Sequence, residues 1–220
     1  MLNNLIDIGD IIQNAALFSP RNWRDAAMAS DALLQAIHRL FDLLETRGAS
    51  YVLVGGVALL NYVEGRNTQD IDLIMAVDDL ENITEIQVTY RDQFFARGDF
   101  QGLQIDIFLT TNPLFRKVQQ EHVTTLHFQE HDVRIATVRG LLLLKLYALP
   151  SLYRQGDFLR VNIYENDIAA LMYQHHPDMD AILSELAPYI SATDLASLQK
   201  IVHEIDQRIR RFQSNQPIDN

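Results

Sequence analysis

Two adjacent glycines, Gly55 and Gly56, separate two apolar runs and limit what the surrounding chain can form. The first run, Tyr51 to Val54, is short and partly β-branched, which predicts a buried strand, while Val57 to Val63 has the spacing of a helix. Glycines let the backbone approach a ligand closely, and the N–H groups at the start of a helix favour phosphate. The order of strand, glycines and helix therefore predicts either a phosphate-binding turn or a simple tight turn.

The rest of the first half alternates between predicted strands and helices. Residues 31–47 place apolar side chains at helical spacing, which predicts an amphipathic helix. Strands are predicted at Asp70–Met75 and Leu103–Leu109, and a helix is expected between them inside Val77–Phe95. Two β-like pieces within residues 123–137 favour a hairpin at the edge of the sheet.

From Val138 onward the pattern changes to helices. Helices are predicted up to Pro150 and then near the following segments: Ile163–Tyr173, Met179–Leu186 and Leu195–Phe212. The sequence thus indicates a first domain over residues 1–140, a C-terminal helical region over 141–214 and a polar tail at 215–220.

The composition excludes several classes of protein. The net charge is −11, from 29 acidic and 18 basic residues, so the chain lacks the overall positive charge that drives nonspecific nucleic-acid binding. There is no cysteine, which excludes disulfides and zinc-thiolate sites and agrees with a cytoplasmic location. The first residues lack a basic leader, and no apolar run approaches the roughly 20 residues needed to span a bilayer. We therefore expect a soluble protein without membrane contact.

Three aspartates carry the most specific chemical signal. Because side chains alternate along a strand, Asp70 and Asp72 project to one face about 7 Å apart, and Asp106 joins them if its strand lies alongside. Carboxylate oxygens suit Mg²⁺, and a metal offsets the repulsion between close carboxylates. Two such ions can hold the attacking and leaving oxygens of a phosphoryl transfer. The three aspartates are therefore predicted metal ligands, although an Asp-x-Asp pair is also common without a metal.

Together, Gly55-Gly56, the segment Gly65–Leu73 and the pair Ile105-Asp106 resemble the nucleotidyltransferase superfamily, and most closely its AbiEii-type branch. The match covers residues 50–110, with a looser one at 138–171. The resemblance implies an α+β (α/β-like) nucleotidyltransferase fold, in which helices flank a mixed sheet and a C-terminal helical region follows. It also implies magnesium-dependent transfer of a nucleoside monophosphate from a nucleoside triphosphate to a hydroxyl or phosphate acceptor, with release of pyrophosphate.

Carried over position by position, the resemblance makes Asp70 and Asp72 catalytic metal ligands and Asp106 a third ligand and candidate base. It adds two basic nucleotide-binding candidates to the glycine pair: Arg66, which precedes the aspartates, and Lys145 in the helical region. A solvated or snorkelling lysine is the ordinary alternative at Lys145.

One departure from the resemblance concerns the helical region. Related sequences often have a basic-acidic pair three residues before an aspartate, whereas this chain has Ile163-Tyr164 before Asp167. The departure leaves the acceptor open among RNA, protein and small molecule. It also keeps a second hypothesis: a non-catalytic module of this fold that binds nucleotide or a partner protein, as in a toxin–antitoxin pair.

Three other features remain open at this point. Metal-binding Asp-x-Asp pairs also mark glycosyltransferases, although those domains are usually longer and lack the glycine pair. The last apolar helix could pack inside the chain or form a homodimer contact. His122, His127 and His131 fit no single face of a strand or helix, and we interpret them as surface histidines of the hairpin without a metal.

Overall fold

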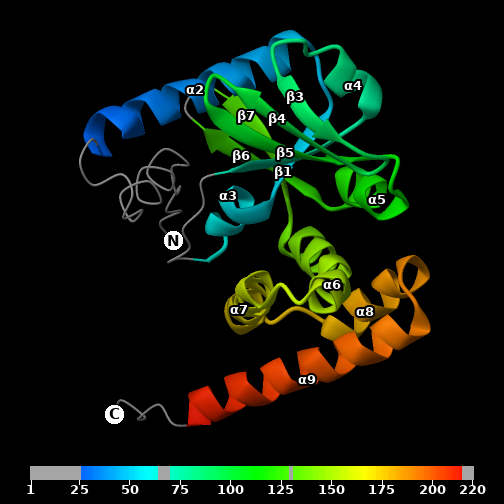
Figure 1. The fold of residues 1–220 in the computed structure, drawn as a ribbon. Helices are drawn as coiled ribbons and strands as arrows, with labels where there is room; N and C mark the ends of the chain where they lie inside the picture. Colours follow the sequence, from blue (N-terminus) through cyan, green and yellow to red (C-terminus); the bar gives the residue numbers. More distant parts are fainter. Residues whose placement is uncertain (1–25, 64–69, 129–130, 215–220) are drawn as a thin grey trace. The chain divides into compact units, whose positions relative to one another are not determined.

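The computed structural model describes residues 26–63, 70–128 and 131–214, and the chain divides into two compact units between Thr137 and Val138. The first unit contains the sheet, and the second consists of helices (Figure 1). The change from strands to helices therefore coincides with the division into units.

Seven strands form one mixed sheet within the described part of the first unit, in the order β3-β4-β5-β2-β1-β7-β6. The strands are β1 (Tyr51–Val54), β2 (Ile71–Met75), β3 (Gln87–Arg91), β4 (Phe95–Phe100), β5 (Leu103–Leu109), β6 (Val123–Phe128) and β7 (His131–Ala136). β2 runs parallel to β5 and β1 parallel to β7, whereas the other neighbouring strands are antiparallel. The predicted edge hairpin is confirmed, because β6 and β7 pair and β6 is the outermost strand.

The middle of the sheet follows directly from the sequence pattern. All of β1 is buried, and β5 alternates four buried aliphatic residues with the half-buried Gln104, Asp106 and Phe108. Because alternate residues of a strand share a face, Asp106 lies on the same face as Phe108. That face is also covered by α5 (Pro113–Glu121), whose Phe115 ring centroid lies 5.4 Å from that of Phe108.

Three further helices belong to the described part of the first unit. α2 (Ala26–Thr46) is the predicted amphipathic helix, and it packs against β5 and β7 along a buried apolar stripe. α3 (Gly55–Leu60) contacts β1 and β2 and begins at the glycine pair itself (Figure 1). α4 (Val77–Glu81) is a short helix after β2.

The prediction of a helix inside Val77–Phe95 is wrong for most of that segment. α4 ends at Glu81, and β3 and β4 follow as an antiparallel pair. β3 is exposed along its whole length, so it lacks the alternating burial by which a sequence reveals a strand. In β4, Gly98 interrupts the apolar pattern because a Cβ there would lie 2.7 Å from Cγ2 of Ile86.

The second unit packs four α-helices in its described residues, with one 3₁₀ turn. They are α6 (Val138–Gln155), α7 (Phe158–His175), α8 (Met179–Leu186), η2 (Ala187–Tyr189) and α9 (Ala192–Ser214). α6 contacts α7, α8 and α9, and Arg139 of α6 donates to the Glu185 carboxylate and the Ala181 carbonyl. Pro150 lies inside α6, so the prediction that this helix ends there is wrong.

Within the described ranges, no helix combines the length and the apolar character that crossing a bilayer requires. The mixed sheet with flanking helices and the helical second unit confirm the predicted α+β class.

Candidate functional site

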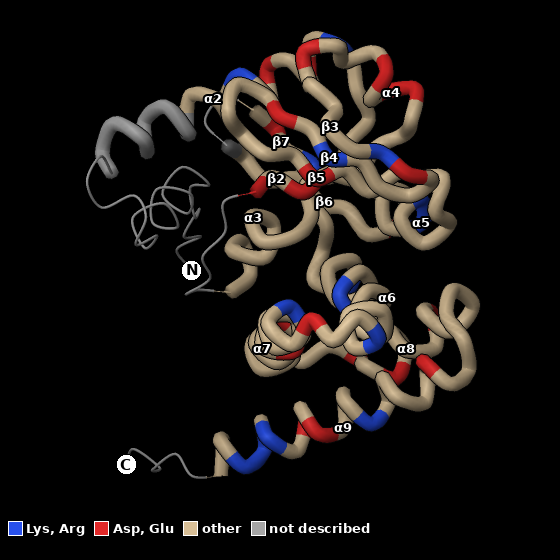
Figure 2. The backbone as a smooth tube through the Cα atoms, in the orientation of Figure 1, with Lys and Arg blue, Asp and Glu red and all other residues tan. Residues whose placement is uncertain are grey.

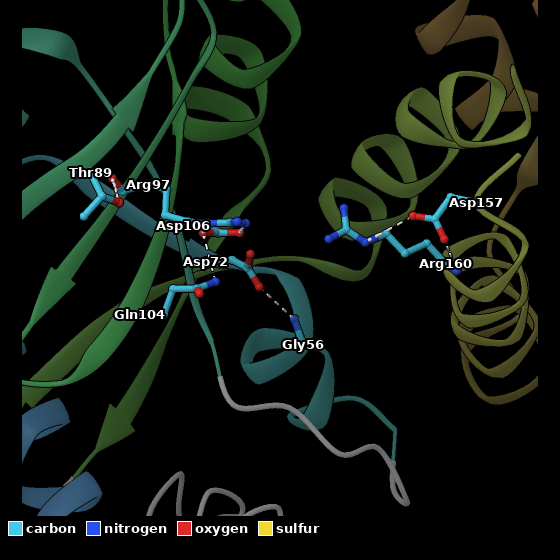
Figure 3. Close-up of polar contacts among 8 residues, drawn as sticks. All are labelled: Gly56, Asp72, Thr89, Arg97, Gln104, Asp106, Asp157 and Arg160. Atoms are coloured by element: carbon cyan, nitrogen blue, oxygen red, sulfur yellow. Dashed lines mark hydrogen bonds and ion pairs between the residues drawn. The ribbon is translucent and has the colours of Figure 1, made fainter. Parts of the chain in front are cut away.

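Two of the predicted aspartates lie side by side on neighbouring strands. Asp72 of β2 and Asp106 of β5 are Cα partners in the parallel pairing of these strands. Partners across adjacent strands point to the same face, and strands are about 4.8 Å apart, so the two carboxylates share one surface. Figure 3 shows both side chains directed toward the same space. The predicted proximity of the Asp106 strand to the Asp72 strand is therefore confirmed.

The glycine pair lies directly against Asp72. The Gly56 N–H donates to Oδ2 of Asp72 at 3.3 Å (Figure 3). Gly55 has φ +62°, and a Cβ at this residue would lie 1.8 Å from Oδ2 of Asp72. Only glycine leaves room for this carboxylate in this backbone conformation. The glycines thus position an aspartate, a role that the sequence pattern did not reveal.

Asp70 is exposed and lies at a bend immediately before β2, so the prediction that the strand begins at Asp70 is wrong by one residue and strand alternation does not place this side chain. Its charge, like that of Asp72, acts on the guanidinium of Arg97, which places Asp70 within electrostatic range of the Asp72–Asp106 surface. Arg66, the predicted phosphate ligand that precedes the aspartates, lies outside the described residues.

Arg97 of β4 is the main residue of the site that sequence reasoning missed. Its Nε and Nη2 each donate to a different oxygen of Asp106, both at 2.7 Å, and Gln104 Nε2 donates to the same carboxylate at 3.4 Å (Figure 3). The Arg97 side chain is 39% exposed and that of Asp106 14%, so this bidentate pair is largely shielded on the carboxylate side.

The three neighbouring carboxylates together stabilise the charged form of Arg97. The hydrogen bonds that Arg97 donates to Asp106 raise the pKa of Arg97 most, burial opposes this rise, and the charges of Asp106, Asp70 and Asp72 add to it. Figure 2 shows the acidic positions of β2 and β5 beside a basic position of β4. Formally, three carboxylates and one guanidinium leave a surplus of negative charge that a divalent cation would balance.

Lys145, the other predicted basic residue, belongs to the second unit. It is 5% exposed, donates from Nζ to Oδ2 of Asp167 at 2.7 Å and lies 4.6 Å from the Tyr164 ring centroid. The alternative of a solvated lysine is therefore wrong. Lys145 thus joins α6 to Tyr164 and Asp167 of α7, which are two of the three residues discussed above for the helical region.

The fold of this chain also occurs among solved structures. Among solved structures, the chain is similar to ANT(2″)-Ia in complex with adenylyl-2″-tobramycin, at 13% identity and a TM-score of 0.51, over 76% of this chain and 98% of that one. It is also similar to an antigenic nucleotidyltransferase-like protein from Paracoccidioides brasiliensis, at 18% identity and a TM-score of 0.49, over 78% and 94%. The likeness to ANT(2″)-Ia shows that the chain has a nucleotidyltransferase fold. No protein-family model and no curated protein sequence matches it.

Proposed function

We propose that this chain is a magnesium-dependent nucleotidyltransferase that moves a nucleoside monophosphate from a nucleoside triphosphate to an acceptor hydroxyl or phosphate. The observation that carries the proposal is the register of β2 and β5, which brings Asp72 and Asp106 side by side on one surface. The contact of the glycine pair with Asp72 supports it, because the chain holds this carboxylate at the cost of a backbone conformation that favours glycine.

The donor atoms of the site fit magnesium. Asp70, Asp72 and Asp106 offer carboxylate oxygens, which a hard cation prefers, and no imidazole lies in the set. When bound, Mg²⁺ would neutralise charge on the triphosphate and on the group that leaves as pyrophosphate. The formal surplus of negative charge left after Arg97 matches this requirement.

The residues of the chain itself take separate roles in the proposal. Asp70 and Asp72 hold the metal, and Gly56 orients Asp72 through its N–H. Asp106 contributes a third carboxylate, whose orientation is fixed by the two hydrogen bonds that Arg97 donates to it. Arg97 also supplies a positive charge beside the space where phosphate oxygens would lie.

Several finer predictions accompany this proposal. Nucleotide contacts of Arg66 and Lys145, a base role for Asp106, membership of the AbiEii-type branch and a toxin–antitoxin context all stay predictions. The structural neighbour ANT(2″)-Ia was solved with an adenylylated small molecule, so we rank a hydroxyl-bearing small molecule first among acceptors. The net charge of −11 ranks RNA below it.

The test is incubation of the purified protein with each α-labelled nucleoside triphosphate, Mg²⁺ and a cell extract separated into small-molecule, protein and RNA fractions. We expect label in one fraction, with a loss of at least about 100-fold in Asp72→Asn, because one metal ligand is removed while the shape is kept. Asp78→Asn is the matched control, since Asp78 is an exposed carboxylate of α4 in the same unit. Equal transfer by wild type and Asp72→Asn would contradict the proposal.

A second candidate function rests on the Arg97–Asp106 pair. Because Arg97 already satisfies both Asp106 oxygens, the surface could bind a nucleotide through Asp70 and Asp72 without completing a three-carboxylate metal site. This alternative predicts nucleotide binding by calorimetry without label transfer. It further predicts that Arg97→Gln tightens Mg²⁺ binding, whereas Arg91→Gln, which removes an exposed pair with Glu81, has no such effect.

A further inference from the structure

A second cluster of metal-ligating side chains lies between α2 and β7, and the proposed nucleotidyl transfer does not use it. Its centre is His131, the first residue of β7, which is 7% exposed. The interpretation of His131 as a surface histidine of the hairpin is therefore wrong. His127, in contrast, is exposed and pairs with the exposed Asp132.

The other members of the cluster come from one face of α2. His38 and Asp42 are four residues apart, so they lie one above the other on the helix, and Glu45 follows one turn later. His38 Nδ1 lies 3.1 Å from His131 Nε2, and Asp42 Oδ1 lies 3.4 Å from the same nitrogen. Two ligands from a helix and one buried ligand from a strand thus meet at a single point.

The spacing of these atoms is that of ligands around one small ion. Zinc bonds to nitrogen and oxygen are about 2.0–2.2 Å long, so two ligand atoms in a tetrahedral site are separated by about 3.3–3.6 Å. The contacts of 3.1 Å and 3.4 Å are close to this range, and one ligand atom from each of His38, Asp42 and His131 lies within 4.8 Å of the others.

Glu45 contacts the other ring nitrogen of His131. Its Oε2 lies 3.2 Å from Nδ1 of His131, which is the ring nitrogen that faces away from His38 and Asp42. A carboxylate in this place accepts the proton of Nδ1 and leaves the lone pair of Nε2 directed at a metal. Carboxylate–histidine–metal chains of this kind fix both the tautomer and the orientation of the ring.

We propose that His38, Asp42 and His131 form a zinc-binding site with Glu45 as the hydrogen-bonding partner of His131. Two imidazoles and one carboxylate favour Zn²⁺ or Co²⁺ over Mg²⁺, so this site is chemically distinct from the oxygen-only set of Asp70, Asp72 and Asp106. The metal ties α2 to β7. A water molecule would complete the four ligands that zinc prefers.

The test uses the full chain, freed of metal by a chelator, and titrates Zn²⁺ in competition with a chromophoric chelator. We expect one Zn²⁺ per chain in wild type, affinity reduced by more than about 100-fold in His38→Gln, and by about 10–100-fold in Glu45→Gln. The Glu45 side chain is exposed and that of His38 is 36% exposed, so these variants leave the buried His131 in place. His127→Gln is the matched control and should bind as wild type does.

Two further readouts separate this site from the proposed magnesium site. Co²⁺ should give the intense visible absorption of a tetrahedral ion in wild type and in Asp72→Asn, and the absorption should be lost in His38→Gln. Zn²⁺ should also raise the Tm of wild type but not of His38→Gln. The proposal is overturned if wild type binds no Zn²⁺, or if His38→Gln and Glu45→Gln bind it as tightly as wild type does.

Discussion

Substitution of Gly55 by alanine tests the link between the glycine pair and Asp72. Gly55 has φ +62°, and the added Cβ would lie 1.8 Å from Oδ2, 2.3 Å from Cγ and 2.6 Å from Cβ of Asp72. A non-glycine residue in the left-handed region costs roughly 1–2 kcal/mol, and an overpacked contact adds roughly 1–3 kcal/mol. We expect Gly55→Ala to lower the free energy of unfolding by about 2–5 kcal/mol.

Gly48 provides a control for the backbone contribution alone. Its φ is +64°, and nothing lies within 4 Å of a Cβ added there. Gly48→Ala should therefore lower the free energy of unfolding by only about 1–2 kcal/mol and leave nucleotide binding and transfer unchanged. The difference between the two variants in urea denaturation isolates the collision with Asp72.

The same steric overlap should also lower the rate of nucleotidyl transfer. Ordinary contact begins near 3.4 Å, so the Asp72 carboxylate must withdraw from the added methyl group in Gly55→Ala. A displacement of about 1 Å at a reacting site can cost on the order of 100-fold in rate. Combining Gly55→Ala with Asp72→Ala removes the contacts at 1.8 Å and 2.3 Å and leaves the one with Cβ at 2.6 Å, so the two destabilisations should be less than additive. If Gly55→Ala is as stable and as active as Gly48→Ala, the reasoning is refuted.

Two other predictions concern stability. Lys145→Met leaves the Asp167 carboxylate buried without the Lys145 ammonium, so the free energy of unfolding measured in urea should fall by about 3–5 kcal/mol. The double substitution Lys145→Met, Asp167→Leu should recover most of this loss. A single variant as stable as wild type would contradict the importance of the buried pair. Burial raises the pKa of Tyr51 to about 12, with a smaller contribution from Glu45 that Arg134 opposes. Tyr51 loses its proton near pH 10 in the unfolded chain but only near pH 12 in the folded chain. The free energy of unfolding should therefore fall between pH 10 and pH 12, by up to about 2–3 kcal/mol. Tyr51→Phe should flatten this fall, and an unchanged profile would show that Tyr51 is not its source.

The parts of the site that the sequence predicted depend on local pattern. Alternation along β5 and the apolar run of β2 identified both strands, and Asp72 and Asp106 followed from their positions on them, whereas Asp70 lies just before β2. The glycine pair was recognised from its place between an apolar strand and a helix, but its contact with Asp72 depends on the register of β1 against β2. Local pattern thus found the residues, and only the pairing of the strands gave their contacts.

The functional residues that the sequence did not predict fall into two groups. Some contact partners that are distant along the chain, and one belongs to a strand whose alternation of apolar and polar residues is weak. Arg97 belongs to β4, which was concealed by the exposed β3 before it and by Gly98 within it. His38 and His131 are 93 positions apart, so the sequence alone does not bring these two side chains together. The pair His38 and Asp42, four apart on an amphipathic helix, was the available signal.

A paired-label transfer experiment tests the central claim most directly. The protein is given one nucleoside triphosphate labelled either at the α-phosphate or at the γ-phosphate, with Mg²⁺ and the acceptor fraction. The account predicts that the α-label joins the acceptor while the γ-label leaves as pyrophosphate, and that both events cease in Asp72→Asn. Transfer of the γ-label to the acceptor, or transfer of the α-label that persists in Asp72→Asn, would contradict the account.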